Sequence, residues 1–317
     1  MRPTARQAFI DGAQRLAAYL PRRWDRRLRE LGKMAIPHHG QRFSPARELE
    51  YVLLRRRSQY LVAPFGPGQL VVDTQDQEIG RTVFLTGGYE RWHMETALRE
   101  LARRGRRVEG TVFVDVGANI GTSTVDALLL GGFVSAVCFE PEPHNVRLLT
   151  ANAALNGLAD RVEVHPVALS DIDGAGLLQR SSTNLGDHRV VSSAAAATNG
   201  HGDRRPAEKV QCRRLDGLVE DGVLDPESVG LFWSDAQGHE LKILRGATTL
   251  ADAGVPHVIE FCPDLLGDDA PELEDHVASR FSDIVDLRTG SPVSPAALPE
   301  LRRKYLRRSY TDLLLIP

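Results

Sequence analysis

The sequence predicts an α/β domain built on a largely parallel sheet, on the strength of three observations. From residue 110 to 317, short apolar runs alternate with stretches of helical periodicity. The first of these runs ends in a glycine-containing turn that leads into a helix, as in nucleotide-binding βα units. The 317 residues are 42% hydrophobic and 26% charged, which is typical of a soluble globular chain with a substantial core.

Residues 1–60 differ from the rest of the chain in charge. They hold 14 basic against five acidic residues, a net charge of +9, whereas the whole chain carries −3. We expect a basic helical N-terminal arm here, either a solvated helical face or a contact for an acidic partner. Residues 61–109 are expected to form a cap with strands at 69–73 and 82–86, followed by a helix over 93–103.

Seven apolar runs predict the strands of the main domain, residues 110–317. They lie at 111–116, 135–140, 162–169, 230–235, 256–261, 281–287 and 311–317. Because helical patterns separate most of these runs, consecutive strands are expected to be joined by helices and to run parallel.

The turn after the first of these strands predicts a ligand site. The strand at 112–116 is followed by Gly117 and Gly121, and a glycine turn before a helix lets backbone N–H groups approach a ligand closely. The next strand ends at Glu140, 25 positions after Asp115. Doubly wound nucleotide-binding folds place an acid at about this spacing, where it accepts hydrogen bonds from ribose hydroxyls. The pattern predicts an adenosine site.

The spacing of the two glycines distinguishes between adenosine cofactors. A dinucleotide turn has the pattern G-x-G-x-x-G, whereas three residues separate Gly117 from Gly121, and Asp115 precedes them. A carboxylate there would repel a pyrophosphate but suits the ammonium group of a methionine moiety. The electrostatics favour S-adenosylmethionine, and a dehydrogenase remains an alternative only if NAD binds better.

Several motifs in order along the chain resemble those of the FkbM-type methyltransferases. They are VDVGANIG at 114–121, FEPEP at 139–143, ALSD at 168–171 and WSDAQGHE at 233–240, with Leu149, Asn152 and Asn156 between and a lead-in at 76–80 and 88–90. The resemblance covers about residues 60–317. It implies a class I methyltransferase (Rossmann-like) fold, a seven-stranded, mostly parallel sheet whose last strand, 310–316, is antiparallel.

The resemblance also implies S-adenosyl-L-methionine as cofactor and a set of residues that bind it. These are Asp115, Gly117, Asn119 and Gly121 at the methionine end, Glu140 at the ribose, and Ala168, Ser170 and Asp171 near the adenine. The motif at 233–240 departs from the family at Ala236 and Gln237, where Val-Glu is common. Any role of that glutamate is therefore in doubt here.

The acceptor side is predicted from residue chemistry. Asp235 ends a strand at the sheet edge where open α/β sheets bind ligands, and His239 follows within one helical turn. A hydroxyl acceptor requires a general base, for which His239 is the candidate, with Asp235 positioning donor or acceptor; helix capping is the alternative role of Asp235. Possible substrate contacts are Asn184, Asp187, His188, Arg189 and Glu260. The first four also fit an ordinary polar loop, and Glu260 also fits an acid in a buried strand that needs a partner.

Together these features predict a methyltransferase that methylates a hydroxyl on a sugar, glycan or natural product. The alternatives are an N- or nucleic-acid methyltransferase, and a catalytically inert cofactor-binding module. The net acidic main domain argues against a nucleic-acid partner. No metal site is predicted, because the three cysteines form no C-x-x-C pair. Without a long apolar run or a signal peptide, we expect a cytoplasmic protein with no transmembrane segment. The sequence predicts neither the acceptor molecule nor the oligomeric state.

Overall fold

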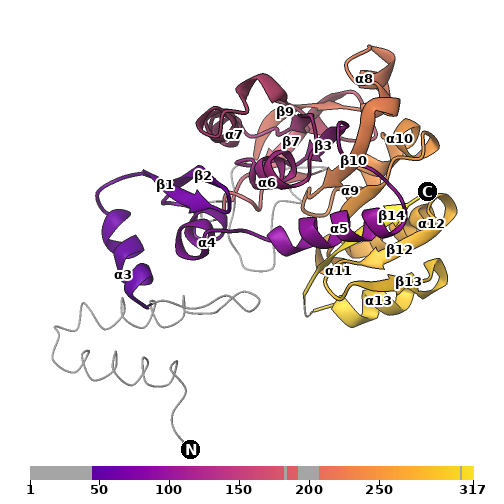
Figure 1. The fold of residues 1–317 in the computed structure, drawn as a ribbon. Coiled ribbons are helices and arrows are strands. Elements are labelled where there is room, and N and C mark those ends of the chain that lie inside the picture. The colour runs from indigo at the N-terminus through magenta and orange to yellow at the C-terminus, as the bar shows by residue number, and fades with distance from the viewer. Residues whose placement is uncertain (1–44, 182–183, 192–206, 308) are drawn as a thin grey trace, which may run out of the picture. The chain divides into compact units, whose positions relative to one another are not determined.

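The computed structural model of the protein describes residues 45–181, 184–191, 207–307 and 309–317 (Figure 1). The chain divides into two compact units, residues 1–52 and 53–317. Of the first, only the start of helix α3 (Pro45–Leu54) is described. Most of the expected basic arm therefore lies outside the described residues, and the expected boundaries at residues 60 and 109 stay predictions.

The second unit is built on an eight-stranded sheet with the order β13-β12-β14-β11-β10-β3-β4-β5. The strands are β3 (Val112–Val116), β4 (Ser135–Phe139), β5 (Val162–His165), β10 (Val229–Ser234), β11 (His257–Phe261), β12 (Asp283–Asp286), β13 (Ser291–Val293) and β14 (Thr311–Ile316). All pairs from β11 through β10, β3 and β4 to β5 are parallel, whereas β14 is antiparallel to β11 and β12. The predicted mostly parallel sheet with an antiparallel last strand is confirmed, and β13 adds an eighth strand at the edge.

Helices cover this sheet (Figure 1). Helices α6 and α7 pack on strands β3, β4 and β5, α5 packs on α6, and α12 contacts both α9 and α13. The helices are α5 (Arg91–Arg103), α6 (Thr122–Leu130), α7 (Pro143–Leu155), α8 (Leu215–Glu220), α9 (Glu240–Arg245), α10 (Thr248–Asp252), α11 (Pro263–Leu266), α12 (Ala270–Arg280) and α13 (Leu298–Tyr305). Among the described helices, none combines the length and apolar character needed to cross a bilayer.

The lead-in to the main sheet contains one prediction that is confirmed and one that is wrong. The strand at 69–73 is β2 (Gly68–Asp73), which pairs with β1 (Tyr60–Phe65) in an antiparallel hairpin. The expected strand at 82–86 is instead the end of helix α4 (Ile79–Thr86). The carboxylate of Asp76 accepts hydrogen bonds from the backbone N–H groups of Glu78 (3.1 Å) and Gly80 (2.8 Å), so this segment begins as a capped helix.

The apolar run at 162–169 forms two strands instead of the expected one. Pro166 has no backbone N–H to donate to a strand ladder, and it separates β5 from β6 (Ala168–Leu169). Strand β6 belongs to a second sheet with the order β6-β9-β7-β8. Its other strands are β7 (Gly174–Gln179), β8 (Arg189–Val191) and β9 (Ala207–Arg213). A flexible insertion is expected over 192–209, of which 192–206 lie outside the described residues and 207–209 begin β9.

Candidate active site

The candidate active site lies where the strand order of the main sheet reverses, between β3 and β10. Open α/β sheets bind ligands at such a point, beyond the carboxyl ends of the strands. Here β3 leads into Gly117, and β10 leads into Asp235. The φ of Gly117 is +74°, and a Cβ on it would lie 2.0 Å from the carbonyl oxygen of Asp235. Both the backbone conformation and the neighbouring strand end therefore require glycine here.

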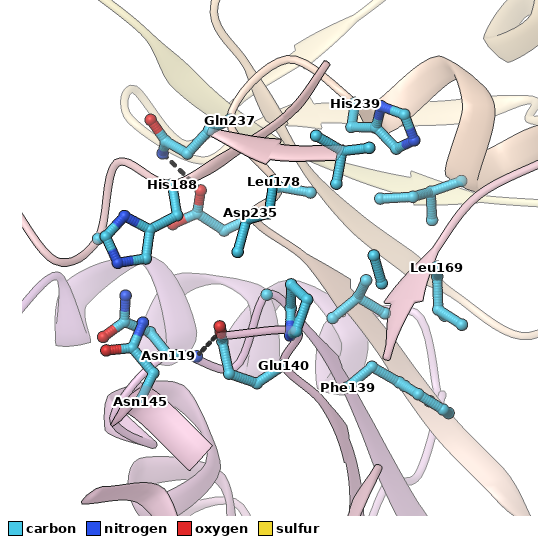
Figure 2. A pocket seen from close by; sticks show the side chains of 18 of the residues that line it. Asn119, Phe139, Glu140, Asn145, Leu169, Leu178, His188, Asp235, Gln237 and His239 are labelled. Carbon is cyan, nitrogen blue, oxygen red and sulfur yellow. Dashed lines mark hydrogen bonds between the residues drawn. The ribbon is translucent and has the colours of Figure 1, made fainter. Parts of the chain in front are cut away.

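A first cavity, with about 490 Å³ of empty space, opens beside this turn (Figure 2). Its apolar walls come from Val116, Phe139, Pro141, Leu169, Leu178, Val190 and Ile243. Its polar side chains are Asn119, Glu140, Asn145, His188, Asp235, Gln237 and His239. Apolar walls with a few convergent polar groups are typical of a cofactor site.

The side chain of Glu140 is fixed by the backbone around it. Its Oε2 accepts a hydrogen bond from the N–H of Asn119 (2.8 Å), and its Oε1 accepts one from the N–H of Glu142 (2.9 Å). Burial raises the pKa of Glu140 to about 7, although these hydrogen bonds act in the opposite direction. Since each carboxylate oxygen has two lone pairs, both can still accept a bond from a ligand hydroxyl.

Asn145 presents a buried acceptor to the first cavity. The residue is 1% exposed, and within the described part of the chain its Oδ1 has no hydrogen-bond partner. Its Nδ2 donates to the carbonyl oxygen of Leu185 at 3.1 Å, and Asn119 Nδ2 donates to the same oxygen at 2.9 Å. A buried polar atom without a partner is costly, so we expect a ligand donor to satisfy Asn145 Oδ1.

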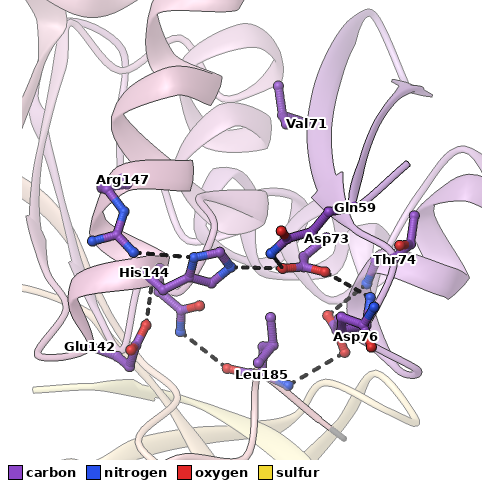
Figure 3. A network of polar contacts seen from close by, with 12 residues as sticks. Gln59, Val71, Asp73, Thr74, Asp76, Glu142, His144, Arg147 and Leu185 are labelled. Atoms are coloured by element: carbon purple, nitrogen blue, oxygen red, sulfur yellow. Dashed lines mark hydrogen bonds and ion pairs between the residues drawn. The ribbon is translucent and has the colours of Figure 1, made fainter. Parts of the chain in front are cut away.

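The loop 184–191 is tied to the lead-in (Figure 3), and through the bond from Asn119 to Leu185 it is also tied to the cofactor turn. The N–H of Leu185 donates to Asp76 Oδ1 at 3.4 Å. The lead-in hairpin is in turn held to α7, because Nε2 of His144 lies 3.0 Å from Oδ2 of Asp73. These contacts hold the lead-in beside the site.

A second cavity, with about 760 Å³ of empty space, adjoins the first. The wall common to both consists of Gly117, Asn119, Gly186, Asp235 and Gln237. The other residues that line the second cavity are Ile79, Tyr89, Glu90, Arg91, Met94, Asp115, Ala118, Thr122, Ser123, Asp126, Asn184, Trp233 and Asp312. A ligand that passes this common wall would reach from one cavity into the other.

Strand register explains why carboxylates from distant positions meet here. Trp233 is paired with Asp115, and Glu260 is paired with Asp312, so alternation along the strands puts these side chains on one face of the sheet. Because β14 is antiparallel, its first residues lie at the edge where the parallel strands end. Helix α5 covers this face, since Nδ1 of His93 lies 2.9 Å from Oδ2 of Asp312.

Burial raises the pKa of four described carboxyl groups in the second cavity. That of Asp126 rises to about 6, although Arg91 acts in the opposite direction. The pKa of Asp115 rises to about 7, although the hydroxyl of Thr124 donates to its Oδ2 at 2.5 Å and acts in the opposite direction. The pKa of Asp235 rises to about 6 and that of Glu90 to about 7, in both cases through burial first and then through the charge of Asp312. These groups therefore titrate near neutral pH.

Most of the described non-glycine residues with a left-handed backbone line the two cavities. Among the described non-glycine residues, Glu90 (φ +49°), Asn119 (+51°), Gln237 (+54°) and Arg307 (+57°) have positive φ. The first three line one or both cavities. This conformation is unfavourable for such residues and is found preferentially at functional sites.

The predicted cofactor residues occupy three kinds of position. Gly117, Asn119, Glu140 and Ala168 line the first cavity, Asp115 lines the second, and Gly121, Ser170 and Asp171 line neither. Gly121 (φ +89°) is the N-cap of α6, and a Cβ on it would meet the side chain of Leu149 at 2.5 Å. Its glycine is explained by the left-handed backbone and the packing against Leu149, without a ligand contact.

The predicted acceptor-side residues are dispersed. Asp235 lines both cavities, His188 and His239 line the first, and Asn184 lines the second. Asp187, Arg189 and Glu260 line neither: Arg189 Nε donates to Asp187 Oδ1 at 2.7 Å, and Gln237 Nε2 lies 3.4 Å from Glu260 Oε2.

His239 lies with the residues of the expected adenine end. Its Nε2 lies 3.0 Å from the hydroxyl oxygen of Ser170, and burial lowers its pKa to about 4. It is absent from the lining of the second cavity, where the acidic groups collect. His239 shares the first cavity with Asp235 but not the second, and its role as the base stays a prediction.

Several polar residues of the second cavity are not among the sequence predictions. They are Tyr89, Glu90, Arg91, Asp126 and Asp312. Two signals point to some of them: the lead-in motif at 88–90, and the place of Asp312 at the start of an antiparallel strand. Within the described residues, no group of three or more His, Cys, Asp or Glu side chains is arranged to hold a metal ion.

Comparison with known proteins gives a family, a relative and solved structures. The model of the methyltransferase FkbM domain matches residues 115–285. The 2-O-methyltransferase NoeI of Sinorhizobium fredii (strain NBRC 101917 / NGR234) is 26% identical over 153 residues, which cover 43% of this chain and 56% of NoeI. The chain thus spans little more than half the length of this relative.

Two solved structures from Pyrococcus horikoshii are matched at 10% identity and a TM-score of 0.42. One is TYW2 in complex with MeSAdo, where the match covers 81% of this chain and 70% of that chain. The other is a putative transferase, where it covers 96% of both chains.

Proposed function

The chain belongs to the methyltransferase FkbM domain family, and from this premise we propose that it methylates a hydroxyl oxygen on a sugar, glycan or natural product. Its cofactor is S-adenosylmethionine. When bound, this cofactor supplies a methyl group on a sulfonium centre, already activated for transfer.

The residues of the first cavity fit the adenosine part of this cofactor. Glu140 accepts the ribose hydroxyls, with its carboxylate held by the two backbone N–H groups. The unpartnered Oδ1 of Asn145 accepts a ligand donor, and the apolar walls take the adenine. Gly117 and Asp115 lie toward the second cavity, where a carboxylate suits the ammonium of the methionine part.

The lining of the second cavity is the observation that carries the acceptor class. Its carboxylates are Glu90, Asp115, Asp126, Asp235 and Asp312. Among the described residues that line it, the one cationic side chain is Arg91, whose Nε donates to both oxygens of Asp126 at 3.0 Å. A phosphate-rich acceptor such as RNA would be repelled here. A neutral polyhydroxylated molecule can donate hydrogen bonds to the carboxylates and pack on Trp233 and Tyr89.

Two further points support oxygen as the methylated atom of such a molecule. NoeI, the relative described above, is named as a 2-O-methyltransferase. Asp235 lies in the wall common to both cavities, with Oδ1 held by Nε2 of Gln237 at 2.9 Å. From that wall its carboxylate positions the donor and the acceptor relative to each other, and this proximity is a large part of the catalysis that methyl transfer needs.

The test is transfer from S-adenosylmethionine with a carbon-13-labelled methyl group to a panel of acceptors. The panel contains methyl glycosides, oligosaccharides, an amino sugar and bulk transfer RNA. We expect labelled O-methyl ethers of the glycosides or oligosaccharides, which the chemical shift of the methyl carbon distinguishes from N-methyl products. Label in the RNA or only on nitrogen would replace the proposal. Cofactor binding with no product on any acceptor would indicate an inert binding module.

A further inference from the structure

We infer that Glu90 is the general base of the reaction, the group that takes the proton from the acceptor hydroxyl as the oxygen attacks. This inference rests on the proposed function, because it requires a hydroxyl acceptor in the second cavity. It assigns the base to the lead-in segment, outside the residues that the family model matches.

The place of Glu90 is on the acceptor side of the site. Among the carboxylates of the second cavity, Asp235 also lines the first cavity, next to the cofactor residues. Glu90 lines only the second cavity and is partly exposed there. A base must reach the acceptor hydroxyl without blocking the methyl donor, and Glu90 meets both conditions.

The other carboxylates of this cavity are already engaged. Asp126 gives both of its oxygens to Arg91, and Asp312 is paired with His93 at 2.9 Å. Asp115 is 1% exposed and holds the hydroxyl of Thr124. Arg91 and His93 hold the first two carboxylates, and Asp115 faces the ammonium of the cofactor in the proposed binding mode, so these three groups are occupied by other partners.

Glu90 has a partner that orients it without neutralising it. The hydroxyl of Tyr310 donates to its Oε1, and within the described residues no hydrogen bond to its Oε2 is found. The residue has a left-handed backbone (φ +49°) at the N-cap position of α5, and its side chain makes no capping hydrogen bond there. A left-handed backbone is unfavourable for a glutamate and is found preferentially at residues with a functional task.

The charged and titratable groups around Glu90 come from four segments. Tyr89 and His93 flank it on its own segment, Tyr310 and Asp312 face it from the start of β14, and Asp235 faces it from the end of β10. Burial first, and then the charge of Asp312, raise its pKa to about 7, against the opposing effects of His93 and Tyr310. Arg288 acts on this group of charges through His93. A base with a pKa near the working pH is the most effective.

The proton step balances as follows. The O–H bond of the acceptor breaks and a new O–H bond forms on Oε2 of Glu90. The electron pair freed on the acceptor oxygen makes its bond to the methyl carbon, and the carbon–sulfur bond breaks with its electrons on sulfur. The proton on Glu90 then passes to water when the products leave.

The experiment compares the wild type with Glu90→Gln and with Glu95→Gln, an exposed glutamate on the same helix. Glycoside methylation is measured as a function of pH, cofactor binding by calorimetry, and thermal unfolding of the protein alone from pH 4 to 8. We expect Glu90→Gln to lower kcat about 10²–10⁴-fold, the usual contribution of a general base, while its affinity for S-adenosylmethionine stays within about threefold.

The unfolding series reports on Glu90 without any acceptor. A pKa raised from 4.5 to about 7 on folding makes the wild type lose stability as the pH rises through that window. The melting temperature of Glu90→Gln relative to wild type should therefore increase from pH 4.5 to 7 and then level off, whereas that of Glu95→Gln should show no such trend.

Three results would count against these assignments in distinguishable ways. Glycoside methylation by Glu90→Gln at the wild-type rate would overturn the inference and leave the proposed function standing. So would a stability difference that does not change between pH 4.5 and 7. A wild type that binds the cofactor and methylates no hydroxyl acceptor would overturn the proposed function, and the inference with it.

Discussion

A Cβ atom on Gly117 would stand 2.0 Å from the carbonyl oxygen of Asp235, so the ends of strands β3 and β10 touch through their backbones. This contact joins the turn that approaches the cofactor to the segment that carries Asp235 and Gln237. Any side chain at position 117 would displace the wall that both cavities share. The placement of donor and acceptor therefore depends on the absence of a side chain at Gly117.

Gly117→Ala should abolish cofactor binding. The substitution forces alanine into a left-handed conformation, which costs about 1–3 kcal/mol, and also pushes on the Asp235 carbonyl. Gly222→Ala is the matched control, because Gly222 has φ +75° and an added Cβ there would meet no described residue within 4 Å. Calorimetry with S-adenosylmethionine and thermal unfolding separate the two effects. Equal behaviour of the two variants would show that the contact with Asp235 has no importance for binding.

Glu140→Ala should weaken cofactor binding by roughly 2–4 kcal/mol, because two hydrogen bonds to a charged acceptor are lost and such losses do not simply add. Glu163→Ala, at an exposed position on the neighbouring strand β5, should bind like wild type. Binding is measured by calorimetry, and circular dichroism checks that the fold is kept. A Glu140→Ala variant with wild-type affinity would remove the ribose assignment.

Asp115→Asn should make the protein more stable and yet lose the cofactor. The pKa of Asp115 is raised from 3.8 to about 7 by burial, so the folded wild type loses stability as the pH rises from about 4 to 7. At about 1.4 kcal/mol per pKa unit, the variant should gain up to roughly 4 kcal/mol relative to wild type at pH 8. Denaturant unfolding at pH 4 and 8 measures this, with the exposed Asp160→Asn as control. A variant that is destabilised at pH 8 would contradict the argument.

His239→Gln should raise KM for S-adenosylmethionine and change kcat by less than about tenfold. His239 lines the first cavity and its Nε2 lies 3.0 Å from the hydroxyl oxygen of Ser170. Its lowered pKa of about 4 keeps the ring neutral at physiological pH. Steady-state kinetics with a glycoside acceptor decide the point. A loss of 10² or more in kcat, with a changed pH profile, would return this histidine to the role of base.

The cofactor half of the site is formed by short continuous segments of the chain, which is why the sequence predicts it. Gly117 and Glu140 follow two neighbouring strands directly, so each one's place depends only on recognising its own strand. The main-sheet strands are recognisable for the same reason. Residues 82–86 of the lead-in are wrongly predicted as a strand. The strand preference of their β-branched and aromatic residues is outweighed by the hydrogen bond from Gly80 to Asp76 and by the burial of Val83 and Phe84 in a helix.

The acceptor half of the site depends on contacts between residues far apart in the sequence, which no local sequence pattern predicts. Glu90 and Tyr310 are 220 positions apart, and they meet because β14 is inserted antiparallel between β11 and β12. Asp312 reaches the cavity for the same reason. His239, by contrast, is near Asp235 in sequence but turns toward Ser170, since the intervening Gln237 and Gly238 both have positive φ. Proximity in sequence is a poor guide within such a turn.

The hydrogen bond from Tyr310 to Glu90 gives the last prediction. The phenol stabilises the ionised carboxylate, so Tyr310→Phe should raise the pKa of Glu90 further. A hydrogen bond to a charged group contributes about 1.5–3 kcal/mol, which corresponds to roughly one to two pKa units. Because the base must be ionised to accept the proton, the acidic limb of the pH–rate profile should move to higher pH by that amount, while the rate on the alkaline plateau stays close to wild type.

Tyr305→Phe is the matched control for this shift. Its hydroxyl donates to Asp286 Oδ2 at 2.8 Å, a second buried pair of phenol and carboxylate, and neither residue lines the two cavities. Loss of that bond should cost stability and leave the acidic limb in place. If both variants keep the wild-type limb, the ionisation that governs the rate belongs to a group other than Glu90. If Tyr310→Phe moves the limb to lower pH, the phenol opposes the active form, and the general base is not the carboxylate that it touches.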